Sequence, residues 1–154
     1  MSSTVTITPF LWFVDNAEAA IQRYAEVFDD AEVLDETRMP DGSLFVASIR
    51  LQGQDLVLMN GGPSHRLSEA FSLSVSVETQ EDVERLSDAL IEGGGSQDSC
   101  GWLKDPFGLS WQIVPTALQR LMSDPDPERA GRVQQALMGM KRISIAELEA
   151  AHAG

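Results

Sequence analysis

The sequence predicts an α+β fold of two βαβββ modules, each with a mixed sheet, followed by a helical C-terminal tail. The main observation is a repeat, because apolar residues at helical spacing recur 62 residues later along the chain. The matching pairs are Ile21 and Val83, Tyr24 and Leu86, and Phe28 and Leu90. We expect a domain over residues 1–116, with modules at about 5–62 and 69–115, and a helical extension over 117–154.

The first module begins with a predicted strand over residues 7–13, where side chains alternate between two faces. Asp15 and Glu18 then have the spacing of a capping box, which opens a helix with one apolar face. Three further strands are predicted at residues 31–38, 44–51 and 55–60. Pro40, Gly42 and Gly53 supply the turns between them.

The second module repeats this order. Residues 70–77 alternate strictly as a strand, and Thr79 with Asp82 forms the next capping box. The triple glycine at 93–95 ends the helix. A short strand and then strands at 101–104 and 109–114 follow.

A tight turn of sequence D-P-F-G joins the last two strands. Pro106 fixes φ for the first central position, Asp105 can accept a hydrogen bond from the backbone two residues on, and Gly108 tolerates positive φ. The alternation beyond the turn places Gln112 on the face opposite Trp111.

The tail has its own helix signals. Asp126 and Pro127 are a typical N-cap and first helical residue, for a helix running to about Met140, and Ser144 with Glu147 opens another helix. An apolar stripe runs along the first of them, at Ala130, Val133, Ala136, Leu137 and Met140. We expect this stripe to pack across the sheet or onto a second subunit.

Composition excludes several classes of partner. The 154 residues carry 24 acidic and 11 basic side chains, a net charge of −13, which disfavours nucleic acid and anionic membranes. No apolar run approaches the roughly 20 residues that span a bilayer, and the first residues lack a signal-peptide pattern, so cytoplasmic residence is expected. Cys100 is the single cysteine, and His65 and His152 are the only histidines, so neither a disulfide nor a structural zinc site is expected.

Several motifs carry a family resemblance. The segments A-I-Q-R-Y-A-E-V-F and D-P-F-G-L-S-W-Q-I resemble the vicinal oxygen chelate superfamily of glyoxalases, bleomycin-resistance proteins and extradiol dioxygenases. The segments T-P-F-L-W-F, M-N-G-G-P, C-G-W-L-K-D and W-Q-I-V-P are similar to its PhnB-like branch, whose members often carry the label 3-demethylubiquinone-9 3-methyltransferase. The resemblance covers nearly the whole chain, tail included, and implies a glyoxalase-like fold of curved sheets.

The resemblance also implies positions for a metal site. Metal-using relatives place His, Glu or Gln where this chain has Pro9, Met59, Ala70 and Gln112. Pro9 and Ala70 offer no ligand, and a thioether with one neutral amide does not suit Zn²⁺, Mn²⁺ or Fe²⁺. Moving the alignment by one residue brings in Thr8, Asn60, Phe71 or Trp111 and still gives no site. We therefore expect no metal and no cofactor.

Methyl transfer is not supported by the glycines. Transfer from S-adenosylmethionine usually needs a Gly-rich turn after a parallel strand. Gly61 and Gly62 instead follow the last strand of the first module, and the triple glycine follows a helix. We therefore treat the methyltransferase label as a name only.

The candidate ligand-binding residues are neutral or aromatic. Asn60, Ser72, Ser74 and Gln112 are candidate hydrogen-bonding groups, and Phe10, Trp12 and Trp102 are candidate apolar walls. The simpler interpretation is that the aromatic rings are core packing and the serines a solvated strand face. Cys100 beside Lys104 is either a reactive thiol or, more simply, a small core residue.

Two functional hypotheses follow. The first is a metal-free homodimer that binds a small molecule of unknown identity. The second is a metal-dependent lyase, isomerase or dioxygenase, and an interaction domain is a weaker third. No catalytic residue is assigned, because neither a nucleophile with its base nor a pair of carboxylates can be assembled from the sequence.

Overall fold

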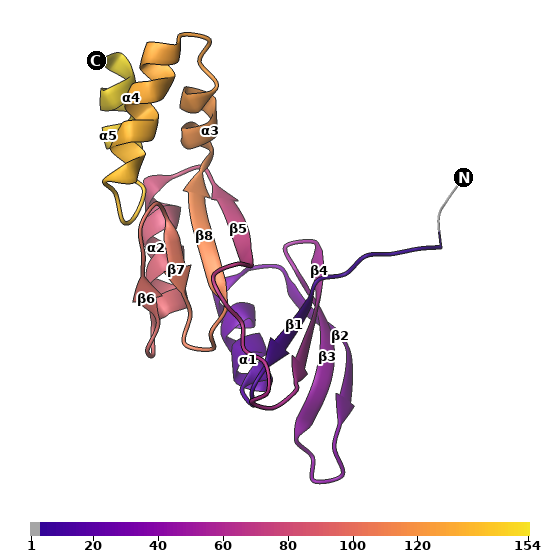
Figure 1. Ribbon diagram of the computed structural model, residues 1–154. Helices are drawn as coiled ribbons and strands as arrows, with labels where there is room; N and C mark the ends of the chain where they lie inside the picture. The colour runs from indigo at the N-terminus through magenta and orange to yellow at the C-terminus, as the bar shows by residue number, and fades with distance from the viewer. Residues whose placement is uncertain (1–3) are drawn as a thin grey trace. The chain divides into compact units, whose positions relative to one another are not determined.

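The computed structural model describes residues 4–154 (Figure 1). The chain divides into two compact units, Met1–Leu67 and Ser68–Gly154, each considered by itself below. Each unit contains a strand, a helix and three further strands in that order, and three more helices follow in the second unit. The predicted α+β class with two βαβββ modules and C-terminal helices is confirmed.

The first unit is a four-stranded mixed sheet with one helix. Its elements are β1 (Phe10–Phe13), α1 (Ala17–Val27), β2 (Ala31–Arg38), β3 (Leu44–Leu51) and β4 (Gln54–Asn60). The strand order is β1-β4-β3-β2, with β1 parallel to β4 and the other neighbours antiparallel. Leu11, Ile49 and Leu58 on the sheet and Tyr24 on α1 are buried, because α1 covers one face of the sheet.

The second unit repeats this topology. Its elements are β5 (Ser72–Val77), α2 (Gln80–Ile91), β6 (Ser96–Gln97), β7 (Trp102–Lys104) and β8 (Ser110–Pro115). The order is β5-β8-β7-β6, again with the first and last strands of the module parallel. Leu103, Trp111 and Ile113 share the buried face with Val83 and Leu90 of α2.

The start of the first unit differs from the prediction in two ways. The first strand begins at Phe10 and not at Ile7, because Pro9 has no N–H to donate and the last β4 contact is from Val57 N to the Pro9 carbonyl. Residues 4–9, here called the N-terminal arm, belong to no helix or strand.

The capping box predicted at Asp15 is also wrong. Asn16 is the N-cap of α1, and its side chain caps nothing. Asn60 Oδ1 at the end of β4 instead accepts a hydrogen bond from Ala17 N at 2.9 Å. A first-turn N–H of α1 therefore finds its acceptor on strand β4. The spacing of residues in the sequence does not show such a long-range contact.

The other helix starts agree with the sequence. Thr79, Asp126 and Ser144 each accept a hydrogen bond from a first-turn amide of α2, α4 and α5, respectively. The tail contains α3 (Thr116–Met122), α4 (Pro127–Met138) and α5 (Ile145–Ala153). The helix predicted to reach Met140 ends two residues earlier, and α3 was not separately predicted.

In the apolar stripe of the tail, Val133 and Met140 are buried, and Ala130, Ala136 and Leu137 are half-buried. The buried cluster of the tail consists of Leu121, Val133, Met140, Ile143 and Leu148. Val114 at the end of β8 packs against it, so the stripe meets the end of the sheet and does not lie across it. The segment between α4 and α5 attaches this cluster to the module. Cys100 N and Gly101 N donate to the carbonyls of Met140 and Lys141. Among residues 4–154, no helix combines the length and apolar composition needed to cross a bilayer.

Candidate functional site

The D-P-F-G turn organises one end of the second sheet. Asp105 is 2% exposed, and its Oδ1 accepts hydrogen bonds from Phe107 N and Leu109 N at 2.9 and 3.0 Å. Its Oδ2 accepts from Trp111 Nε1 at 2.9 Å. Gly108 has φ +99°, as the turn requires. The buried carboxylate thus holds β8 in register with β7.

The face of this sheet opposite α2 carries the polar side chains. Pairing places Ser74, Gln112 and Trp102 in one row across β5, β8 and β7. The next row is formed by Ser72, Ser110 and Lys104. Paired residues share a face, so these six side chains form one surface, here called the hydroxyl-rich face.

Gln112 and Ser72 are joined by a hydrogen bond. Gln112 Nε2 donates to Ser72 Oγ at 2.9 Å, and Gln112 is half-buried. Among the described residues, nothing donates to its carbonyl oxygen. As predicted, Gln112 lies on the face opposite the buried Trp111. Ser74 is exposed and Trp102 is half-buried in the same row, so an acceptor, a hydroxyl and an indole ring lie together.

Ser110 is a residue that sequence reasoning missed. Its side chain is 1% exposed, and its Oγ has no hydrogen-bond partner within residues 4–154. A buried hydroxyl without a partner is uncommon in folded proteins. Its sequence signal was available, because Ser110 follows the same alternation as Gln112, but burial could not be read from it.

An ion pair lies at the end of this face. Lys104 Nζ bonds Glu69 Oε1, and both side chains are partly exposed. The hydrogen bond from Lys104 holds the pKa of the Glu69 carboxyl below its ordinary value. The one ammonium on the face is therefore balanced by a carboxylate, and the remaining polar groups are neutral.

The corresponding face of the first sheet is aromatic and aliphatic. Phe10 is 57% exposed, and Trp12 pairs with Met59 across β1 and β4. The Trp12 indole donates to Gly62 O at 2.9 Å, and the His65 ring contacts it edge-on at a centroid distance of 4.8 Å. The segment after β4 therefore folds back over Trp12, and the indole nitrogen is already bonded.

Asn60 and Cys100 are engaged within the fold. Asn60 Nδ2 donates to Leu44 O at 3.0 Å, and Asn60 Oδ1 accepts from Ala17 N of α1. Both ends of its side-chain amide are therefore hydrogen-bonded to the backbone. Cys100 is half-buried, and its thiol lies 3.5 Å from the Leu137 carbonyl. The structure thus brings Ser72, Ser74, Trp102 and Gln112 together on one face and gives Asn60 a structural contact.

The metal positions implied by the resemblance do not fit a metal. Pro9 and Ala70 carry no donor side chain, Met59 offers a thioether, and the Gln112 amide nitrogen already bonds Ser72. This set does not suit the divalent ions of the superfamily. Within residues 4–154, no three His, Cys, Asp or Glu side chains cluster so as to hold a metal ion.

Comparison with known proteins decides the family. Residues 5–114 match the family model described as 3-demethylubiquinone-9 3-methyltransferase. The chain belongs to this family. The match ends at residue 114, so α3, α4 and α5 lie outside it, whereas the sequence resemblance was expected to include the tail. No match was found among proteins of curated function.

Solved structures agree with this family and its glyoxalase-like fold. The chain is 27% identical to a PhnB protein of Bacillus cereus, which is described as a candidate 3-demethylubiquinone-9 3-methyltransferase. The TM-score is 0.67, and the match covers 73% of this chain and 100% of the Bacillus cereus chain. The protein PA1353 of Pseudomonas aeruginosa is 21% identical, with a TM-score of 0.60 over 73% and 98%. A fosfomycin resistance protein, FosX of Listeria monocytogenes, is 14% identical, with a TM-score of 0.55 over 77% and 97%, and shares the fold alone.

Proposed function

We propose that this PhnB-like protein is a metal-free homodimer that binds a small molecule on the hydroxyl-rich face. The observation that carries the proposal is the row of Ser74, Gln112 and Trp102, on the side of the sheet away from α2. An indole ring beside an amide and a hydroxyl can hold a planar, mainly neutral molecule by stacking and by hydrogen bonds at its edge. Cytoplasmic residence, as expected from the sequence, is part of this proposal.

The polar chemistry of the face favours a neutral ligand. Lys104 is balanced by Glu69, and the other polar side chains are hydroxyls and an amide. The Gln112 carbonyl can accept a hydrogen bond, while the exposed Ser74 hydroxyl can donate or accept one. Because Gln112 Nε2 already bonds Ser72, the carbonyl oxygen is held in place before a ligand arrives.

Methyl transfer, which the family description names, is not part of the proposal. Parallel strands β1 and β5 are followed by residues 14–16 and 78–79 before their helices begin, and neither turn contains a glycine. A Gly-rich turn at this point is the usual cradle for the cofactor of such enzymes. The metal-dependent alternative would require ligands other than the four positions implied by the resemblance.

A panel of metabolites and drugs tests binding through melting temperature and tryptophan fluorescence. A binding compound should raise Tm, and its fluorescence signal should be lost in Trp102→Phe and kept in Trp12→Phe. Gln112→Ala should weaken its affinity roughly tenfold, the effect of one hydrogen bond to a held group. Ser76→Ala, one row further along β5, is the matched control and should leave the affinity unchanged.

Two results would contradict the proposal. One is a panel in which no compound raises Tm or quenches tryptophan. The other is elemental analysis of protein purified without chelator that finds close to one equivalent of a transition metal, which would favour the metal-dependent alternative.

A further inference from the structure

Strand β2 forms a long open edge on the first unit. It is the outermost strand of its sheet, has eight residues, and is exposed at all of them except Ala31. Val33 and Leu34 are 50% and 40% exposed. An outer strand of this length presents unpaired backbone groups that can bond an added strand.

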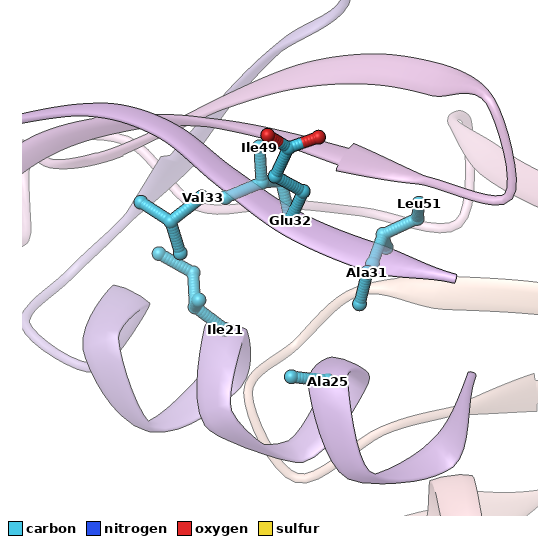
Figure 2. Close-up of a pocket in the computed structure, with 7 residues that line it drawn as sticks. All are labelled: Ile21, Ala25, Ala31, Glu32, Val33, Ile49 and Leu51. Atoms are coloured by element: carbon cyan, nitrogen blue, oxygen red, sulfur yellow. The ribbon is translucent and has the colours of Figure 1, made fainter. Parts of the chain in front are cut away.

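An apolar pocket lies beside this edge. Figure 2 shows it between helix α1 and strands β2 and β3, with Ile21 and Ala25 of the helix pointing toward the sheet. It is shallow, with a volume of about 30 Å³, and opens to solvent. Glu32 is the only charged residue that lines it, and its carboxylate points away from α1 in Figure 2. Its apolar lining therefore suits the tip of an aliphatic side chain.

The N-terminal arm has the composition of a strand. Its sequence is T-V-T-I-T-P, with a β-branched residue at every position from Thr4 to Thr8, and no charged side chain occurs before Asp15. Val5 and Ile7 are 76% and 94% exposed, and their spacing places both side chains on one face of an extended chain. Figure 1 shows the arm running away from the sheet of the first unit.

We propose that the arm of one copy of this chain adds as a strand to the β2 edge of a second copy, with Ile7 directed to the pocket beside α1. Six extended residues span about 20 Å, which matches most of β2. When each copy gives its arm to the other, the exchange closes into a two-fold dimer. The inference rests on the homodimer of the proposed function and gives it an interface.

The arm cannot pair usefully with β2 of its own chain. β1 and β2 lie at opposite edges of the sheet, three strand spacings or about 14 Å apart. An arm that crosses this distance from Pro9 has few residues left to pair.

The charged residues along β2 favour the uncharged arm, and not a second copy of β2, as the strand that pairs with this edge. Glu32, Asp35 and Glu36 lie along β2, and Arg38 already bonds Glu18 and Glu36. Two such strands placed side by side would bring like charges together, whereas the arm brings none.

Sedimentation of the full chain tests the exchange. Ile7→Ser removes the aliphatic side chain and should weaken dimerisation by roughly tenfold or more, since burial of an isoleucine is lost. Thr6→Ser, on the other face of the arm, is the matched control and should leave the dimer constant unchanged. Both variants lie outside the described helices and strands, so folding is not at stake.

A cross-link tests the geometry directly. In a Cys100→Ser background, Ile7→Cys protein mixed with Val33→Cys protein should form a disulfide between chains, and neither protein alone should form it to the same extent. A monomeric wild type would overturn the exchange and the homodimer together. A dimer that Ile7→Ser does not weaken and that gives no mixed cross-link would overturn the exchange alone, and ligand titration of the same variants reports separately on the hydroxyl-rich face.

Discussion

The outermost strands of the two units, β2 and β6, occupy the same place in one topology but differ in length and surroundings. β2 has eight residues and is almost fully exposed, whereas β6 has two residues, and Gln97 within it accepts a hydrogen bond from Arg142 of the tail at 3.1 Å. The tail thus reinforces the edge region of the second unit. The repeat fixes the order of strands, and segments outside the repeat decide which edges stay open.

The two sheets also differ in the side chains on the face that points away from the helix. In the first unit, Trp12 is enclosed by Gly61, Gly62 and His65 from the segment that follows β4. In the second unit, the matching face carries serines and Gln112. One topology therefore presents an aromatic surface once and a hydroxyl-rich surface once, and the second has the groups for directional binding.

The largest expected effect is a difference in unfolding free energy between the turns that precede the last strand of each module, β8 and β4. Asp105→Ala leaves Phe107 N, Leu109 N and Trp111 Nε1 without their acceptor and should cost about 3 kcal/mol or more of unfolding free energy. Gln52→Ala in the turn before β4 removes one exposed acceptor, bonded to Asp30 N, and should cost about 1 kcal/mol or less. Urea denaturation measures both values. Equal losses would show that the turns are equivalent after all.

A smaller effect tests the enclosure of Trp12. A Cβ on Gly61 would lie 2.2 Å from the Trp12 ring, so Gly61→Ala must displace the indole and should cost about 1 to 3 kcal/mol. The emission of Trp12 should change in the same variant. Gly131→Ala on α4 meets nothing within 4 Å and should stabilise the protein by about 0.5 to 1 kcal/mol. An unchanged stability and emission in Gly61→Ala would mean that the enclosure is loose.

The smallest effect concerns the attachment of the tail. Arg142 bonds Glu84 at 2.8 Å and Asp88 at 2.7 Å, and the hydrogen bond from Arg142 lowers the pKa of Glu84 from its ordinary value of 4.5. A lowered folded-state pKa means that this stabilisation is present above pH 4.5 and is lost as the pH falls through the folded value. The Tm difference between wild type and Glu84→Gln should therefore be small at pH 7 and vanish in acid. A difference that grows in acid would contradict this assignment.

Much of the fold could be predicted because it follows from local patterns. Strands 31–38 and 44–51 agree with the structure at both ends, since alternation and turn residues mark them. The N-caps Thr79, Asp126 and Ser144 also agree, since a cap depends on residues three or fewer apart. The cap at Asp15 was wrong because Asn60, 43 residues from Ala17, supplies the acceptor.

The candidate site was predictable only in part. Alternation placed Ser72, Ser74 and Gln112 on strand faces, but the pairing of β5 with β8 and of β7 with β8 is what brings them to Trp102. Asn60 and Trp12 have the same chemistry as the site residues, and their backbone contacts at Leu44 and Gly62 are not visible in the sequence.

The sequence by itself determined the two modules, the helical tail, the acidic charge and the residue types at the four positions where metal-using relatives place ligands, because these depend on residue type and spacing. The tertiary structure alone decided that Val133 and Met140 of the tail are buried in a cluster of the tail, that Ser110 is buried without a partner among residues 4–154, and that β2 stays open beside a pocket. These properties depend on which surfaces meet across long separations in the chain, and a local pattern of side chains does not specify that.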